Sequence, residues 1–169
     1  MESASTIRTE RLEIQPVLES DRRPFVDLFM DSDFMVYSVT GALDRQAANT
    51  RFDHMMAFSR EVAFGKQAII ETSTGSLVGY VGADEFEFGG ESRLEFGYRL
   101  VRASRGLGYA TEAASAMLEV ARRGWQGELL ALIDPDNGAS RNVLVKTGFE
   151  FVEPIMINGD RVELYRCSI

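Results

Sequence analysis

The hydrophobic period changes between residues 93 and 134, and this change constrains the fold more than any other feature. Apolar and polar residues alternate in RLEFGYRL (Arg93–Leu100), which is typical of a strand. From Gly108 to Trp125 the apolar residues recur at the i, i+3, i+4, i+7 spacing of a helix. ELLALID (Glu128–Asp134) is then almost wholly apolar, as expected of a strand buried on both faces. This strand–helix–strand crossover predicts a mixed α/β sheet.

Weaker signals on either side complete the expected order of elements. That order is strand, two helices, three strands, helix, strand, helix and two strands, the last two joined at Asn158-Gly159, a strong hairpin signal. The remaining segments are Arg11–Val17, Ser20–Met30 with Ser20 or Asp21 as its cap, Asp44–Phe64, Gln67–Glu71, Leu77–Phe88 and Asn137–Gly148. Since no internal repeat, low-complexity tract or linker is visible, the sequence predicts one α/β (α+β) domain, residues 1–169, with about seven mostly antiparallel strands flanked by helices.

The charge balance limits the possible partners. With 18 Lys and Arg against 26 Asp and Glu, the formal net charge is −8 at pH 7. That balance argues against nonspecific nucleic-acid binding, which depends on basic residues that neutralise phosphates. A net acidic surface favours a cationic partner, such as an amine or a basic peptide, although it also serves solubility alone.

Cysteine usage and hydropathy indicate a cytoplasmic protein. The single cysteine, Cys167, cannot form an internal disulfide, and no Cys/His cluster has metal-ligand spacing, so no metal is expected. No run of about 18 apolar residues occurs, so we expect no membrane span. The opening residues, MESASTIRTERLEIQPV, also lack the basic and apolar segments of a secretion signal.

The glycine turn RGLGYA (Arg105–Ala110) directly before the long helix is a candidate phosphate site. It is not a P-loop, because the chain has no G-x-x-x-x-G-K-[ST] run. It also misses the dinucleotide fingerprint G-x-G-x-x-G, since Thr111 stands where the third glycine would be. Two interpretations stay open at this point. One is a plain structural turn, and the other is a pyrophosphate held by the free N–H groups at the N-terminus of a helix.

A resemblance bears on this choice. RGLGYA resembles the R/Q-x-x-G-x-G/A signature of the GNAT acyl-CoA-dependent N-acetyltransferases. TERLEIQPV, LEFGYRL and GYATEAASAML are similar to the first strand, the fourth strand and the following helix of the branch that includes the ribosomal-protein alanine and serine N-acetyltransferases. DPDNGASRNVLVKTGF resembles the segment that closes the acyl-CoA site of that family. The resemblance implies a sheet that splays between the fourth and fifth strands to admit the cosubstrate.

The resemblance also implies direct transfer of an acetyl group from acetyl-CoA to an amine. By this analogy the backbone from Arg105 to Thr111 would bind the CoA pyrophosphate, and the backbone of two residues that end the fourth strand would bind the pantetheine arm. The implied cosubstrate-binding residues are Leu100, Val101, Arg105, Gly106, Gly108, Tyr109, Ala110, Thr111, Asn137 and Asn142. Asn137 could equally be a helix cap, and the turn does not identify the acceptor.

The catalytic residues are less defined by the sequence. Glu95, on the polar face of its strand, is the first candidate for the base, followed by Glu85 or water, although Glu95 could equally be a solvated strand residue. A backbone N–H near Tyr98–Leu100 is the candidate donor to the thioester oxygen. Many members of the family carry a tyrosine acid at the position of Leu144. Ser140 is then the remaining hydroxyl, with water or a purely capping role as alternatives.

The acceptor side carries no motif. Phe34, Met35 and Tyr37 fall in the segment that lines it in the family, His54 is either structural or near the substrate, and Cys167 is expected to be inert. The acceptor would be a protein N-terminal amine or a small amine, and the protein a monomer or a homodimer. An alternative is a domain that binds acyl-CoA without turnover.

Overall fold

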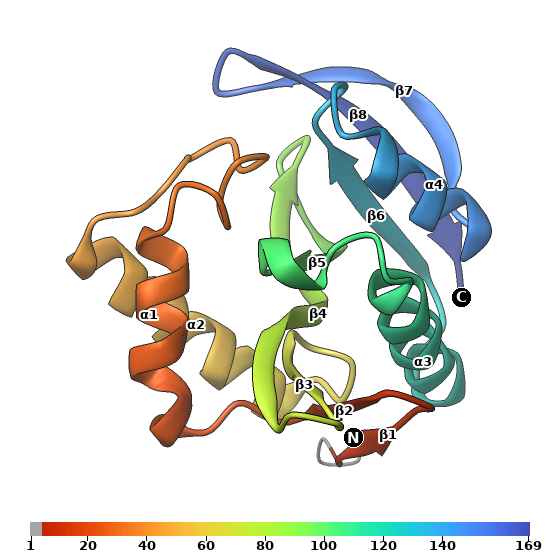
Figure 1. Ribbon diagram of the computed structural model, residues 1–169. Helices are drawn as coiled ribbons and strands as arrows, with labels where there is room; N and C mark the ends of the chain where they lie inside the picture. Colours follow the sequence, from red (N-terminus) through yellow and green to blue (C-terminus); the bar gives the residue numbers. More distant parts are fainter. Residues whose placement is uncertain (1–4) are drawn as a thin grey trace.

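The computed structural model describes residues 5–169, and Figure 1 shows one open sheet with helices on both faces. The strands are β1 (Ile7–Arg8), β2 (Leu12–Gln15), β3 (Gln67–Glu71), β4 (Ser76–Phe88), β5 (Glu91–Leu100), β6 (Glu128–Ile133), β7 (Glu150–Ile157) and β8 (Asp160–Ser168). They lie in the order β1-β2-β3-β4-β5-β6-β8-β7. Over residues 5–169 the sheet has eight strands rather than about seven, because a two-residue segment, β1, pairs with β2.

The sheet opens between β5 and β6, the fourth and fifth of the predicted strands, as the family resemblance implies. These two strands are parallel and pair only at Leu94 with Leu129 and at Glu95 with Leu130. All other neighbouring strands are antiparallel. β5 continues to Leu100, so its second half has no strand partner on the β6 side within the described residues, and the two strands diverge in Figure 1. Alternate backbone N–H and C=O groups of that half therefore face the opening.

Four helices cover the two faces of the sheet. They are α1 (Arg22–Met30), α2 (Arg45–Glu61), α3 (Tyr109–Gly124) and α4 (Gly138–Lys146). α1 and α2 enclose one core with Ala68 and Tyr80 of the sheet, whereas α3 and α4 enclose a second core with the next residues along the same strands, Ile69 and Val81. This division follows from the alternation of side chains along a strand. Within residues 5–169 no helix is both long and apolar enough to cross a bilayer.

The helix ends follow local capping chemistry, with one correction. Asp44 and Asn137 each accept a hydrogen bond from a backbone N–H in the first turn of α2 and α4, so these helices begin one residue later than predicted. The predicted cap of α1, Ser20 or Asp21, is confirmed in position at Asp21 but makes no side-chain hydrogen bond to the helix. Asp21 occupies the N-cap position, but its carboxylate accepts from the backbone N–H of Leu18, which lies before the helix. A short 3₁₀ turn, residues 19–21, fills the intervening space.

The closing hairpin has the predicted turn. Asn158 and Gly159 both adopt positive φ, 51° and 89°. Two positive φ values characterise the turn whose twist matches that of a two-stranded hairpin. The turn places β8 beside β6, so the C-terminal hairpin extends the sheet beyond the opening.

Candidate active site

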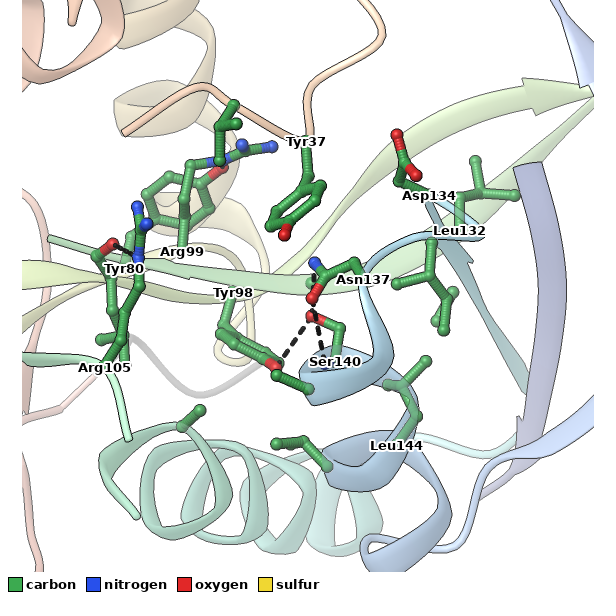
Figure 2. A pocket seen from close by; sticks show the side chains of 18 of the residues that line it. Tyr37, Tyr80, Tyr98, Arg99, Arg105, Leu132, Asp134, Asn137, Ser140 and Leu144 are labelled. Atoms are coloured by element: carbon green, nitrogen blue, oxygen red, sulfur yellow. Dashed lines mark hydrogen bonds between the residues drawn. The ribbon is translucent and has the colours of Figure 1, made fainter. Parts of the chain in front are cut away.

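A pocket of about 520 Å³ occupies the opening between β5 and β6. One half is lined by the glycine turn and by the first turns of α3 and α4. The other half is lined by residues of β4, β5 and α2 on the α1–α2 side of the sheet. The pocket therefore reaches both faces of β5. Figure 2 shows Tyr98 and Ser140 meeting in it, with Tyr80 and Arg99 to one side and Leu144 to the other.

The glycine turn presents free backbone donors at the N-terminus of α3. A 3₁₀ turn, residues 102–104, follows β5, and Gly106 and Gly108 then take positive φ, 75° and 84°. None of the six backbone N–H groups from Gly106 to Thr111 meets an acceptor within residues 5–169. Adding Cβ atoms here would meet nothing within 4 Å at Gly106 and only the Arg11 guanidinium at Gly108. Free N–H groups at a helix N-terminus form an anion site.

Arg11 holds this turn from behind. Its guanidinium donates to the carbonyl oxygen of Leu107 at 2.8 Å and to the carboxylate of Glu112 at 2.8 Å, and lies 4.8 Å from the ring centre of Tyr109. Burial would raise the pKa of Glu112, but hydrogen bonds from Thr9 and Arg11 outweigh burial and lower that pKa. The turn is therefore braced by the β1–β2 segment before any ligand enters.

The side chain of Arg105 donates hydrogen bonds to two backbone carbonyls. Its Nε donates to the carbonyl of Leu100 at 3.1 Å and its Nη2 to the carbonyl of Asp33 at 2.9 Å. The carboxylate of Asp33 also lies 3.9 Å from this guanidinium. The side chain thus joins the end of β5 to the segment that follows α1, in addition to lending positive charge to the turn.

Most of the predicted cosubstrate residues line the pocket. Those that do are Leu100, Arg105, Gly106, Gly108, Tyr109, Ala110, Thr111 and Asn137. Two predicted residues lie outside this lining. Val101 donates its N–H to the carbonyl of Val78 at 2.9 Å, and Asn142 is exposed on α4.

A short chain of polar groups crosses the pocket from β5 to α4. The hydroxyls of Tyr98 and Ser140 are 2.9 Å apart, and the side-chain amide of Asn137 donates to Ser140 Oγ at 3.0 Å (Figure 2). Burial raises the pKa of Tyr98, so its phenol holds its proton. The sequence pattern did not single out Tyr98, because the alternation along β5 assigned it to the apolar face. The Tyr98 hydroxyl was the one sign in the sequence that this position differs from the Leu and Phe positions on that face.

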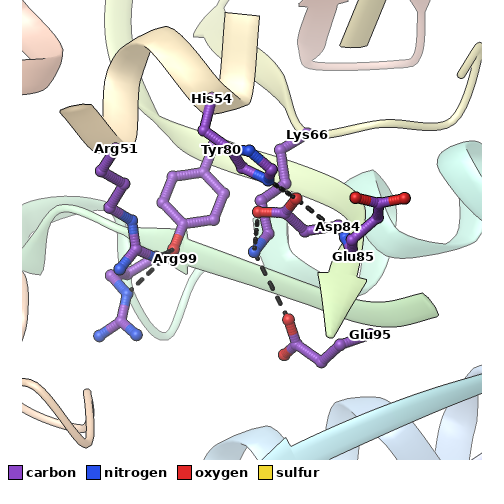
Figure 3. A network of polar contacts seen from close by, with 8 residues as sticks. All are labelled: Arg51, His54, Lys66, Tyr80, Asp84, Glu85, Glu95 and Arg99. Atoms are coloured by element: carbon purple, nitrogen blue, oxygen red, sulfur yellow. Dashed lines mark hydrogen bonds and ion pairs between the residues drawn. The ribbon is translucent and has the colours of Figure 1, made fainter. Parts of the chain in front are cut away.

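Glu95 lies in the pocket and is paired with a buried lysine. Lys66 Nζ is 3.4 Å from a carboxylate oxygen of Glu95 and 3.4 Å from one of Asp84 (Figure 3). The other oxygen of Glu95 lies over Gly97, only 3.1 Å from where a Cβ would stand, so the missing side chain leaves that oxygen room. Burial would lower the pKa of Lys66, but the neighbouring acids outweigh burial and raise that pKa. Glu85, by contrast, is exposed and outside the pocket lining.

A second group on the α1–α2 side was absent from the sequence predictions. The hydroxyl of Tyr80 accepts hydrogen bonds from Arg51 at 3.2 Å and from Arg99 at 3.3 Å (Figure 3). Burial would raise the pKa of Tyr80, but Arg99, Arg51 and Lys66 outweigh burial and lower that pKa to about 8. These residues come from β4, α2 and β5, and no local pattern links such distant positions.

Comparison with known proteins places this geometry in a family. The model of the acetyltransferase (GNAT) domain matches residues 11–150, which include the glycine turn and both halves of the pocket. The chain belongs to the GNAT acetyltransferase family.

Individual relatives agree with the family assignment. An uncharacterized Bacillus subtilis (strain 168) protein, YkkB, is 30% identical over 163 residues, covering 92% of this chain and 91% of that protein. The crystal structure of an acetyltransferase from Agrobacterium tumefaciens C58 is 26% identical with a TM-score of 0.80, covering 98% of this chain and 95% of that one. RimL, a ribosomal L7/L12 α-N-protein acetyltransferase solved with coenzyme A, is 17% identical with a TM-score of 0.75 and coverage of 98% of each chain. At that identity, RimL shares the fold alone.

Of the remaining predicted residues of this GNAT chain, some line the pocket and the others lie outside it. Phe34 and Tyr37 line the pocket, whereas Met35 is buried in the α1–α2 core. His54 is half exposed on α2 and lies 2.7 Å from Asp84, outside the pocket lining. Cys167 is buried on β8, and burial raises its thiol pKa, which disfavours the reactive thiolate.

No metal cluster is evident in the described chain. Residues 5–169 bring together no group of three or more His, Cys, Asp or Glu that could hold a metal ion. Leu144, at the position where many GNAT proteins carry a tyrosine, is buried and lines the pocket. Ser140, on the same helix, and Tyr98, on β5, bring hydroxyl groups into the lining of the same pocket.

Proposed function

We propose that this protein transfers an acetyl group from acetyl-CoA to an amine by direct attack of the amine on the thioester. The observation that carries this proposal is the run of six free N–H groups, Gly106 to Thr111, in a turn of which all residues except Leu107 line the pocket at the split in the sheet. Such a run fits a pyrophosphate, because oxyanions are stabilised by convergent backbone donors and by the helix dipole. Membership of the GNAT family and the coenzyme A bound in RimL support this ligand.

The pantetheine arm would follow the free edge of β5. Within the described chain, residues 97–100 have no strand on the β6 side, so the backbone groups there that face the opening are available to an extended ligand, except the Leu100 carbonyl, which accepts from Arg105. Asn137, at the start of α4, would contact the ligand from the opposite wall. The acetyl end would then lie near Tyr98 and Ser140. Val101 is a weaker candidate, because its N–H is already used.

Residues on both faces of β5 could serve the chemistry. Glu95, directly or through water, would take the amine proton as the new C–N bond forms. A backbone N–H of residues 98–100 would donate to the thioester oxygen as negative charge develops on it. Ser140, linked to Tyr98, would supply a proton to the sulfur as the C–S bond breaks. Proton exchange with solvent would then return Glu95 to its carboxylate form and the Ser140 oxygen to its hydroxyl form.

The test is a thiol-release assay over a panel of amines, run beside calorimetric binding of acetyl-CoA. The expected result is acetyl-CoA binding together with CoA release that depends on the added amine. Binding without release on any amine would instead favour a domain that holds acyl-CoA without turnover. The absence of acetyl-CoA binding would refute both interpretations.

Loss of the Ser140 hydroxyl should lower kcat by about tenfold and leave KM for acetyl-CoA nearly unchanged. The effect is moderate because the thiol has an ordinary pKa of about 8.5, so its thiolate is a weak base and can leave before it is fully protonated. Tyr98→Phe should give a similar reduction. Because the two hydroxyls are 2.9 Å apart, the double variant should be no slower than the slower single variant. Additive losses in steady-state kinetics would show that the two groups act independently.

A further inference from the structure

Two pocket-lining arginines have no acidic partner among residues 5–169. Arg51 and Arg99 are each half-buried, and within residues 5–169 neither has a carboxylate oxygen within 4.0 Å. Their contacts are neutral: both donate to the Tyr80 hydroxyl, Arg51 lies 5.0 Å from the centre of the Phe29 ring, and Arg99 donates to the carbonyl of Phe34 at 3.3 Å. We call Arg51 and Arg99 the arginine pair. Charges withdrawn from water are ordinarily paired, so this arrangement is unusual.

The other cations that line the pocket are compensated. Lys66 is held between Glu95 and Asp84, and Arg105 lies beside Asp33. The excess positive charge on this side of the pocket is therefore confined to the arginine pair. It differs in sign from the whole chain, whose formal net charge is −8.

The arginine pair lies on the opposite face of β5 from the glycine turn. Phe96 and Leu100 belong to the core beneath α3, so Arg99, which alternates with them, projects toward α1 and α2. Its partner in the β4–β5 register is Tyr80, which belongs to the α1–α2 core. The free N–H groups that fit the pyrophosphate lie at the N-terminus of α3, which covers the other face of the sheet. An anion bound by the arginine pair is therefore a separate group from the phosphates of the acetyl donor.

We propose that the arginine pair binds an oxyanion on the acceptor, so that the acceptor is a small amine that also carries a carboxylate, such as an amino acid. This inference rests on the proposed function, because it names the substrate class of the same site. Guanidinium groups match carboxylates in shape and donor geometry, and two of them on one wall would fix the orientation of the acceptor. The negative charge of the whole chain indicated a cationic acceptor. The acceptor contacts the pocket, however, and there the unpaired charge is the positive charge of the arginine pair.

Tyr80 adds a pH signature to this site. The groups that face its hydroxyl are Arg51 from α2, Arg99 from β5 and Lys66 from the segment before β3, and together they lower its pKa to about 8. Above that pH the phenolate would satisfy the same guanidinium groups that an acceptor carboxylate would use. Carboxylate binding should therefore weaken as the pH rises through about 8.

The kinetic test compares L-alanine, β-alanine, L-alaninamide and aminomethylphosphonate as acceptors. We expect kcat/KM, calculated for the unprotonated amine, to be about tenfold or more higher for the better carboxylate than for L-alaninamide. Arg51→Met and Arg99→Met should reduce this ratio to near one, because kcat/KM for the carboxylate should fall much more than kcat/KM for the amide. Arg60→Met, at an exposed position on the same helix, is the matched control and should leave the ratio unchanged. A wild-type ratio near one, or a ratio that survives both variants, would overturn the proposal. A preference for the phosphonate would overturn the carboxylate assignment and indicate an acceptor with a phosphate-type anion.

A binding test separates this inference from the proposed function. Calorimetry with the protein saturated with CoA would compare N-acetyl-L-alanine with N-acetyl-L-alaninamide, neither of which has a titrating amine. We expect the carboxylate to bind about tenfold tighter at pH 7, to lose this advantage in Arg51→Met, and to lose most of it at pH 9. If carboxylate binding is present but no amine releases CoA, the anion site stands and the proposed catalysis fails. If amines are acetylated but the two ligands bind equally, the anion site fails and the catalysis stands.

Discussion

Glu95→Gln should lower kcat by about a hundredfold or more, because general-base catalysis is typically worth at least that factor. Glutamine keeps the shape of the side chain but cannot accept the amine proton. Lys66 would keep Asp84 as its partner, so the fold should survive the change. The measurement is kcat for the wild type and the variant with the same amine at saturating acetyl-CoA, together with thermal unfolding to confirm folding.

Glu85→Gln is the matched control for this experiment. The substitution is the same, one strand away, at an exposed position outside the pocket lining, and it should leave kcat within about twofold of the wild type. Equal effects at the two positions would show that the loss at Glu95 reflects charge alone. An unchanged Glu95→Gln rate would assign the proton transfer to water.

Gly108→Val should weaken acetyl-CoA binding by about tenfold or more. Gly108 has a φ of 84°, which a β-branched residue rarely adopts, so the turn must rearrange. A Cβ there would also stand 3.2 Å from the Arg11 guanidinium that braces Leu107. Both changes misalign the free N–H groups of residues 106–111. Calorimetric titration with CoA measures the loss.

Gly75→Val separates this loss from general strain. Gly75 has a φ of 69° in the β3–β4 turn, its Cβ would meet nothing within 4 Å, and it lies outside the pocket lining. Both variants should therefore unfold at lower temperatures, but only Gly108→Val should lose CoA affinity. Unchanged affinity in Gly108→Val would refute the placement of the pyrophosphate at the N-terminus of α3.

The sequence predicted the elements well because their signals are local. The period of two in β5, the helical period of α3 and the Asn158-Gly159 turn each depend on residues that are close along the chain. The errors have the same origin. Asp21 met the local rule for a cap, but its carboxylate bonded to the residue before the helix, and β1 was too short to show a period.

The residues of the glycine turn were identified for the same reason. A turn that leads into a helix places its N–H groups by local geometry alone, so its residues could be named before the fold was known. Glu95 was likewise assigned to the polar side of its strand from the alternation. The partner of Glu95 could not be assigned, because Lys66 is brought to it by the pairing of β3, β4 and β5.

The sequence by itself determined the class of sheet and the residues of the glycine turn, and the family resemblance added the position of the split. Only the tertiary structure decided which side chains meet inside the pocket. Tyr98 reaches Ser140 because β5 and α4 face each other across the split, and Arg51 reaches Tyr80 because α2 packs over β4. The physical reason is that periodicity records which face of an element is apolar, whereas contacts between distant polar groups depend on how whole elements pack.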